Sequence, residues 1–257
     1  MQGWKIFTHS LGMVFNNLGA ALRISLVLYL IQSAVSVYYT ITFSDYLKAI
    51  STGTMPPPPQ GAIVTGLLVL VVSIIVPIWV AVAWHRYILL EETPDAIFPE
   101  FRGPQIMAYL GKTILIGLLL VIGGIAVGML LGFVFAAIFG PIGAMVGILL
   151  TLVFIVYISY RIGLVLPAAA LGKPMTFGES LDTTSADKGV VLQLAIISIG
   201  FAVLMQVPSY FNADPASIVG LVYSQVIGWI AMMFGISVLT SLYGVYIEKR
   251  ELYVIFQ

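Results

Sequence analysis

The sequence predicts an all-α integral membrane protein with six transmembrane helices, both termini in the cytoplasm, an N-terminal amphipathic stretch and cytoplasmic amphipathic elements. Three observations lead to this fold class. Hydrophobic residues make up 60% of the 257 residues and charged residues only 9%, whereas about a quarter of a soluble domain is charged. Six segments are long and apolar enough to cross a bilayer. The basic residues gather on one side of these segments.

The six segments predict a single transmembrane domain over residues 1–257. About 20 apolar residues span a bilayer as a helix, because unpaired backbone groups in lipid are too costly for open alternatives. The connection at 136–141 is so short that it makes the third and fourth helices antiparallel neighbours. The predicted spans lie near 18–43, 61–84, 113–135, 142–160, 189–207 and 216–247.

The basic residues predict how these spans are oriented. Ten of the eleven Lys and Arg residues fall in the N-terminal region, the second and fourth connections and the C-terminus. Only Lys48 falls in the first connection, and the third and fifth connections contain none. Because Lys and Arg accumulate in cytoplasmic loops, this alternation places both termini and connections two and four in the cytoplasm.

Residues 1–17 predict an amphipathic helix ahead of the first span. Their apolar side chains recur at three- and four-residue spacing, which favours a helix that lies in the cytoplasmic interface. A simple extension of the first span is the alternative, and the pattern does not separate the two. The apolar positions are Trp4, Phe7, Leu11, Val14, Phe15 and Leu18.

Charge and composition exclude several classes of function. The net charge is zero, which argues against a nucleic-acid partner. Cysteine is absent, so disulfides and thiolate metal sites are excluded. Arg23 is the charged residue nearest a helix core, and no Asp or Glu lies at mid-membrane, which disfavours an ion-coupled transporter. With His9 and His85 as the only histidines, we expect no metal, haem or other cofactor.

A candidate lipid-binding, partner-binding or purely structural cluster lies in cytoplasmic connections two and four. Pro167 should bend the apolar stretch 163–172, and Thr176 with Glu179 forms the pattern of a capping box that begins a short amphipathic helix. Arg161 is expected to contact either a lipid headgroup or a carboxylate on this helix. The two connections also resemble one another, as a parallel repeat or by coincidence. The cluster consists of His85, Arg86, Arg161, Pro167, Glu179 and Asp182.

Glycine ridges predict close helix packing. Small residues spaced four apart let two membrane helices approach closely. The ridges of the third and fourth spans should pack those two helices together, and an oligomer interface is the alternative. The predicted packing residues are Gly124, Gly128, Gly132, Gly143, Gly147, Gly228 and Gly235.

Several short motifs resemble one bacterial family. Residues 161–170 read Arg-Ile-Gly-Leu-Val-Leu-Pro-Ala-Ala-Ala, and residues 177–184 read Phe-Gly-Glu-Ser-Leu-Asp-Thr-Thr. Together with Phe-Asn-Asn-Leu at 15–18 and Leu-Tyr-Gly at 242–244, they resemble polytopic proteins related to the membrane domain of glycerophosphodiester phosphodiesterases, including uncharacterised six-span proteins. The resemblance implies a multi-pass protein of the bacterial cytoplasmic membrane. It implies no catalytic residue, because the motifs contain none from the soluble phosphodiesterase domain.

The leading functional hypothesis is a non-enzymatic accessory or scaffold subunit. Its partners would be membrane lipids, other integral membrane proteins or a second copy of the chain. A transporter or lipid translocator is the alternative, and it requires Gln193, Gln206, Ser224 and Gln225 to face one another across a groove. A membrane enzyme is the third hypothesis, with a cytoplasmic site around His85, Arg86, Glu91, Glu92, Arg161, Glu179 and Asp182.

Overall fold

The computed structural model describes residues 2–93, 98–211 and 217–252, and these residues form helices without any strand. Among these described residues, five helices are apolar and long enough to cross a membrane. The elements are α1 (Gln2–Phe15), α2 (Leu18–Thr42), α3 (Ser44–Ser51), α4 (Ala62–Leu90), α5 (Gly103–Ile162), α6 (Val165–Ala170), α7 (Phe177–Thr183), α8 (Lys188–Gln206), the 3-10 helix η1 (Val207–Phe211) and α9 (Ile218–Tyr246).

Four of the predicted spans correspond to α2, α4, α8 and α9, but two helices extend beyond the predicted limits. Helix α4 continues to Leu90, so that His85 and Arg86 lie on its last turns and not in a connection. Helix α5 begins at Gly103, ten residues before the predicted start at 113. Pro104 is a signal for this earlier start, because proline is favoured in the first helical turn. The predicted first residue of the last span, 216, lies outside the described residues.

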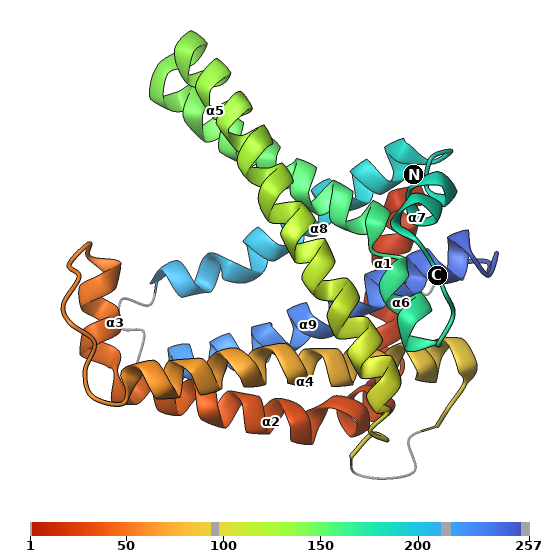
Figure 1. The fold of residues 1–257 in the computed structure, drawn as a ribbon, viewed down its shortest axis with the longest axis horizontal. Coiled ribbons are helices and arrows are strands. Elements are labelled where there is room, and N and C mark those ends of the chain that lie inside the picture. The colour runs from red at the N-terminus through yellow and green to blue at the C-terminus, as the bar shows by residue number, and fades with distance from the viewer. Residues whose placement is uncertain (1, 94–97, 212–216, 253–257) are drawn as a thin grey trace.

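Helix α5 folds back on itself as a hairpin (Figure 1). Gly140 alone in it has non-helical backbone angles, φ 63° and ψ −145°, which are essentially restricted to glycine. The two arms run antiparallel and touch along the glycine seam. A Cβ on Gly147 would lie 2.9 Å from the Cα of Gly132, and a Cβ on Gly128 would lie 3.4 Å from Thr151 Cγ2. The hairpin projects away from α2, α4 and α9, which lie alongside one another.

Helix α1 is a separate element and not an extension of α2. The chain turns at Asn16 and Asn17, and the Asn17 side chain donates to the carbonyl of Met13, 2.9 Å away, at the end of α1. Helix α1 packs across α8 and α9. Its buried face therefore contains Phe7 and Val14, as the pattern predicted, whereas Trp4 and Phe15 of the same apolar set are exposed.

Helix α9 is the centre of the bundle. It packs against α1, α2, α4 and α6, and hydroxyl, indole and imidazole groups join it to three of these helices. Hydrogen bonds between helices are favoured in a membrane because their polar groups find no water there. The joined pairs are Ser10–Ser241, Ser25–Trp229, Tyr29–Gln225, Trp84–Ser237 and His85–Thr240.

One end of the bundle carries most of the charge, and we call it the charged end. Helices α1, α6 and α7 lie there, whereas α3 lies at the opposite end (Figure 1). Arg250, which follows α9, donates to the carbonyls of Ile88 and Leu89 at the end of α4. The C-terminal segment is thus tied to the same end as α1.

Candidate functional site

His85 is completely buried between α4, α5 and α9. Its Nδ1 lies 2.8 Å from Thr240 Oγ1 and its Nε2 lies 3.4 Å from the Tyr109 hydroxyl. The Thr240 hydroxyl also donates to the carbonyl of Ile236, which leaves its oxygen able to accept from His85 in the tautomer that carries the hydrogen on Nδ1. The side chain therefore joins three helices and does not face the other members of the predicted cluster.

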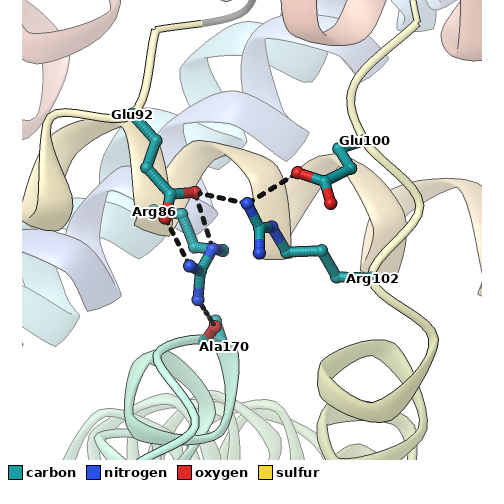
Figure 2. Close-up of polar contacts among 5 residues, drawn as sticks. All are labelled: Arg86, Glu92, Glu100, Arg102 and Ala170. Carbon is teal, nitrogen blue, oxygen red and sulfur yellow. Dashed lines mark hydrogen bonds and ion pairs between the residues drawn. The ribbon is translucent and has the colours of Figure 1, made fainter.

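Arg86 joins α4 to the connection that follows it and to α6 (Figure 2). Its guanidinium forms a two-pronged ion pair with Glu92, in which Nε lies 2.8 Å from Oε2, and Nη1 donates to the carbonyl of Ala170 over 3.1 Å. Arg102 completes the network, with Nη2 at 3.3 Å from Glu92 and 2.6 Å from Glu100. Hydrogen bonds from Arg86 hold the pKa of Glu92 below its usual value.

Arg161 anchors α7 to the end of α5. Its Nη2 donates to the carbonyl of Leu181 over 2.6 Å and its Nε to the Thr184 hydroxyl over 3.1 Å. In return, the Ser180 hydroxyl donates to the carbonyl of Arg161 over 2.6 Å. The partners in these bonds are a backbone carbonyl and hydroxyls. The sequence offered a carboxylate on this helix as one possible partner of Arg161. Among the described contacts, Arg161 bonds to neither Glu179 nor Asp182.

Glu179 acts within its own helix. The predicted capping box is confirmed, since Thr176 Oγ1 accepts from the Glu179 backbone N–H and the Glu179 carboxylate accepts from the Thr176 N–H. Hydrogen bonds from the Thr176 backbone and hydroxyl lower the pKa of Glu179. Asp182 is exposed on the same helix. Of the acidic residues in the predicted cluster, Glu179 thus caps α7 and Asp182 is exposed.

Pro167 lies in a short helix that is entirely buried. All six residues of α6 are buried against α4, α5 and α9. The helix is interrupted at Gly163 and Leu164, before the proline, and not at Pro167 itself as predicted. Proline is tolerated at the third position of a helix because the first four N–H groups have no partner within the helix. Residues 163–170 of the apolar stretch are therefore packed between helices, whereas Gly172 at its end is exposed.

Three guanidinium groups at the charged end share one role that the sequence did not reveal. Arg86, Arg161 and Arg250 each donate to backbone carbonyls at the C-terminal end of a helix, namely α6, α7 and α4. The last four carbonyls of a helix lack partners within it and carry partial negative charge. These arginines therefore stabilise helix ends by supplying charged donors to their carbonyls.

Arg161→Ala should lower the free energy of unfolding by about 2 kcal/mol, since it leaves the Leu181 carbonyl without its charged donor. The measurement is unfolding of the purified protein in mixed micelles. Asp182→Ala is the matched control, because this exposed residue lies on the same helix, and it should stay within about 0.5 kcal/mol of the parent. Equal losses in the two variants would contradict the assignment.

The described residues form at least three cavities that open at the charged end. One of about 580 Å³ is lined by His9, Arg250, Glu91 and Glu251 among others. A second of about 590 Å³ contains the Arg86–Glu92–Arg102–Glu100 network and Glu91. A third of about 500 Å³ is lined by Lys112, Lys173 and Thr176, with α6 as its apolar wall. In the sequence these two lysines belong to the basic residues whose alternation predicts the topology.

The polar residues that a transport groove requires do not gather in one place. Gln193 accepts a hydrogen bond from the N–H of Gly3 over 3.1 Å, at the start of α1. Gln206 lines a cavity between α5, α8 and α9. Gln225 lines a different, mostly apolar groove between α2 and α9, and its amide donates to Ser224. These four side chains therefore lie at three separate places.

The predicted packing glycines differ in how closely they are approached. A Cβ on Gly143 would overlap the carbonyl oxygen of Phe135, and a Cβ on Gly228 would lie 2.6 Å from the Tyr29 hydroxyl. A Cβ on Gly124 would meet only the end of the Ile155 side chain. For Gly132 and Gly235 a Cβ would point into open space. The tightest contacts thus belong to the second arm of the hairpin and to α9.

The fold and its charged end define a class, namely an all-helical protein whose apolar helices are compatible with several membrane crossings. Comparisons with known proteins add no particular identity: no protein-family model, no curated protein and no solved structure matches this chain.

Proposed function

We propose that the chain crosses the membrane six times, with both termini in the cytoplasm. The arms of the α5 hairpin, residues 103–139 and 141–162, are about 55 Å and 33 Å long at 1.5 Å per residue. Each exceeds the bilayer core of about 30 Å. Two crossings by α5 bring the basic residues of the charged end to one side of the membrane, as the positive-inside rule requires.

Single-cysteine labelling tests this topology, and the absence of native cysteine removes any background. Three exposed positions serve: Thr54 before α4, Phe139 at the hairpin tip and Ser185 between α7 and α8. In intact cells an impermeant maleimide should label Thr54→Cys and Phe139→Cys. Ser185→Cys should react only after permeabilisation. Labelling of Ser185→Cys in intact cells would mean that α5 crosses once.

The membrane is proposed to be the bacterial cytoplasmic membrane, on the resemblance to the family of phosphodiesterase membrane domains. The motifs of residues 161–170 and 177–184 form one packed unit, in which Arg161 bonds to Leu181 and Ser180 bonds back to Arg161. The buried α6 separates the two bonded segments. This mutual packing supports a shared structural role for the motifs.

The proposed role is that of a non-enzymatic accessory or scaffold protein that associates with membrane lipids or other membrane proteins. One observation carries this proposal. Arg86 and Arg161, the two basic residues of the predicted cluster, are bonded to helix ends of their own chain, and so is Arg250. The residues that an enzyme site would need do not converge on one another, since His85 is buried against Thr240. The four polar residues that a transport groove would need lie at three separate places.

Native mass spectrometry of the protein, extracted gently from its own membranes, tests this role. A stoichiometric partner chain or a retained lipid is the expected result. A bare chain that moves a solute into liposomes would overturn the proposal and favour a transporter. Arg161→Ala adds a second criterion, since on the proposed role it lowers stability and leaves the set of bound partners of the folded fraction unchanged.

A further inference from the structure

We propose that the cavity lined by Lys112 and Lys173 binds the phosphate of an anionic phospholipid from the inner leaflet. This inference rests on the proposed topology, which places the charged end at the cytoplasmic interface. The cavity of about 500 Å³ lies between the first arm of α5, α6 and the segment before α7. We call it the lysine cavity.

Charge distinguishes the lysine cavity from the other two at the charged end. Glu91 and Glu251 line the cavity that contains Arg250, and the Arg86–Arg102 cavity contains three glutamates. Among the described residues that line the lysine cavity there are two lysines and no carboxylate. Basic pockets of this kind on the cytoplasmic side of membrane helices suit phospholipid headgroups.

Lys112 is held in position for such a ligand. Its ammonium group donates to the carbonyl of Met175 over 3.2 Å and lies 5.2 Å from the centre of the Phe177 ring. An ammonium group has three donors, so the contact with Met175 leaves capacity for a phosphate oxygen. The Thr176 hydroxyl also lines the cavity but is engaged by Glu179.

Lys173 is only loosely paired. Its ammonium lies 3.8 Å from Glu248, longer than the 2.7–2.9 Å typical of a charge-assisted hydrogen bond. The same glutamate lies 2.7 Å from Arg250, which compensates its charge. The Lys173 side chain is 54% exposed and can turn toward a phosphate.

The helix that carries Lys112 also offers a path for acyl chains. Ala108 and Lys112 line the cavity, and Leu115, Leu119 and Ile122 continue the same helical stripe toward the membrane interior. These three side chains are 48%, 50% and 67% exposed. The seam residues Gly124 and Gly128 lie on the opposite face, against the second arm. A phospholipid can therefore place its phosphate in the cavity and its chains along the stripe.

The test is titration of the purified chain with dioleoyl phosphatidylglycerol and dioleoyl phosphatidylcholine, with bound lipid counted by native mass spectrometry. We expect tighter binding of phosphatidylglycerol. The double variant Lys112→Gln, Lys173→Gln should weaken that binding by about 10- to 30-fold. The matched control Lys5→Gln, Lys188→Gln removes two exposed positive charges from the same end and should change it less than about threefold.

Further arms separate the possible outcomes. Ala108→Phe leaves both lysines in place and fills the cavity, so it should also abolish the preference for phosphatidylglycerol. The unfolding temperature of each variant verifies that it folds. Inorganic phosphate bound as tightly as the long-chain lipid would assign the site to free phosphate and overturn the lipid source. Equal losses in the lysine-cavity and control variants would overturn the site itself. Neither result would affect the topology, which the cysteine labelling tests separately.

Discussion

Replacing Arg86 by alanine is expected to lower the free energy of unfolding by about 3 kcal/mol. The change removes the two-pronged ion pair with Glu92 and leaves the Ala170 carbonyl without its donor. Because the Arg86 side chain is only 10% exposed, water cannot replace these bonds. The measurement is equilibrium unfolding in mixed micelles at neutral pH.

Arg102→Ala is the matched control within the same network. Its side chain is 30% exposed, and its closest partner, Glu100, is 69% exposed. Exposed ion pairs contribute about 0–1 kcal/mol, so this variant should lose about 1 kcal/mol or less. A loss as large as that of Arg86→Ala would mean that net charge at this end, and not the buried bonds of Arg86, determines stability.

Acidification should reduce the effect of Arg86→Ala. The folded protein holds the pKa of Glu92 below its usual value of about 4.5, with hydrogen bonds from Arg86 as the main cause. A carboxyl group with a lowered pKa contributes stability that is complete above the unfolded pKa and is lost as the pH falls through the folded pKa. The difference between parent and variant should therefore be constant above about pH 5 and shrink below it.

Gly143→Ala is expected to lower the free energy of unfolding by about 3 kcal/mol and to open the α5 hairpin. The added Cβ would overlap the carbonyl oxygen of Phe135 and lie 3.0 Å from the Cβ of Phe139. Neither is the mobile end of a long side chain, so the second arm must shift. The measurement is unfolding, combined with cross-linking of cysteines placed at Gly128 and Thr151 on the two arms.

Gly117→Ala provides the control for this hairpin variant. It lies on the first arm, where an added Cβ meets nothing within 4 Å, and alanine favours a helix over glycine. We expect unchanged or slightly higher stability and unchanged cross-linking. If Gly143→Ala kept the same cross-linking yield as Gly117→Ala, the close contact at the hairpin turn would be refuted.

Much of the local structure could be predicted because its causes lie close together in the sequence. Apolar length located α2, α4, α8 and α9, since a run of that length is stable only as a helix in lipid. The capping box of Thr176 and Glu179 was predictable because its partners are three residues apart. Helix ends were less certain, and α4 and α5 both exceed their predicted limits.

The candidate site was harder to predict because its partners come from distant segments. His85 was grouped with the cytoplasmic charges, but it is buried against Thr240, 155 residues away in the sequence. The predicted partner of Arg161 was a lipid headgroup or a carboxylate, but in the structure Arg161 donates to a backbone carbonyl. Every residue has such a carbonyl, so no sequence pattern marks which one an arginine will bond. A shared site of Lys112 and Lys173 could not be predicted, because only the fold brings them to one cavity.

The amino-acid sequence was sufficient to predict that the chain is helical, where its apolar helices lie and that its basic residues alternate with them, because each follows from composition over a short stretch. The tertiary structure decided the rest. It made α9 the centre of the bundle, buried α6 as a plug, and turned three arginines inward to the ends of helices. These features depend on polar groups that must find partners away from water, and only the packed helices determine which partners are within reach.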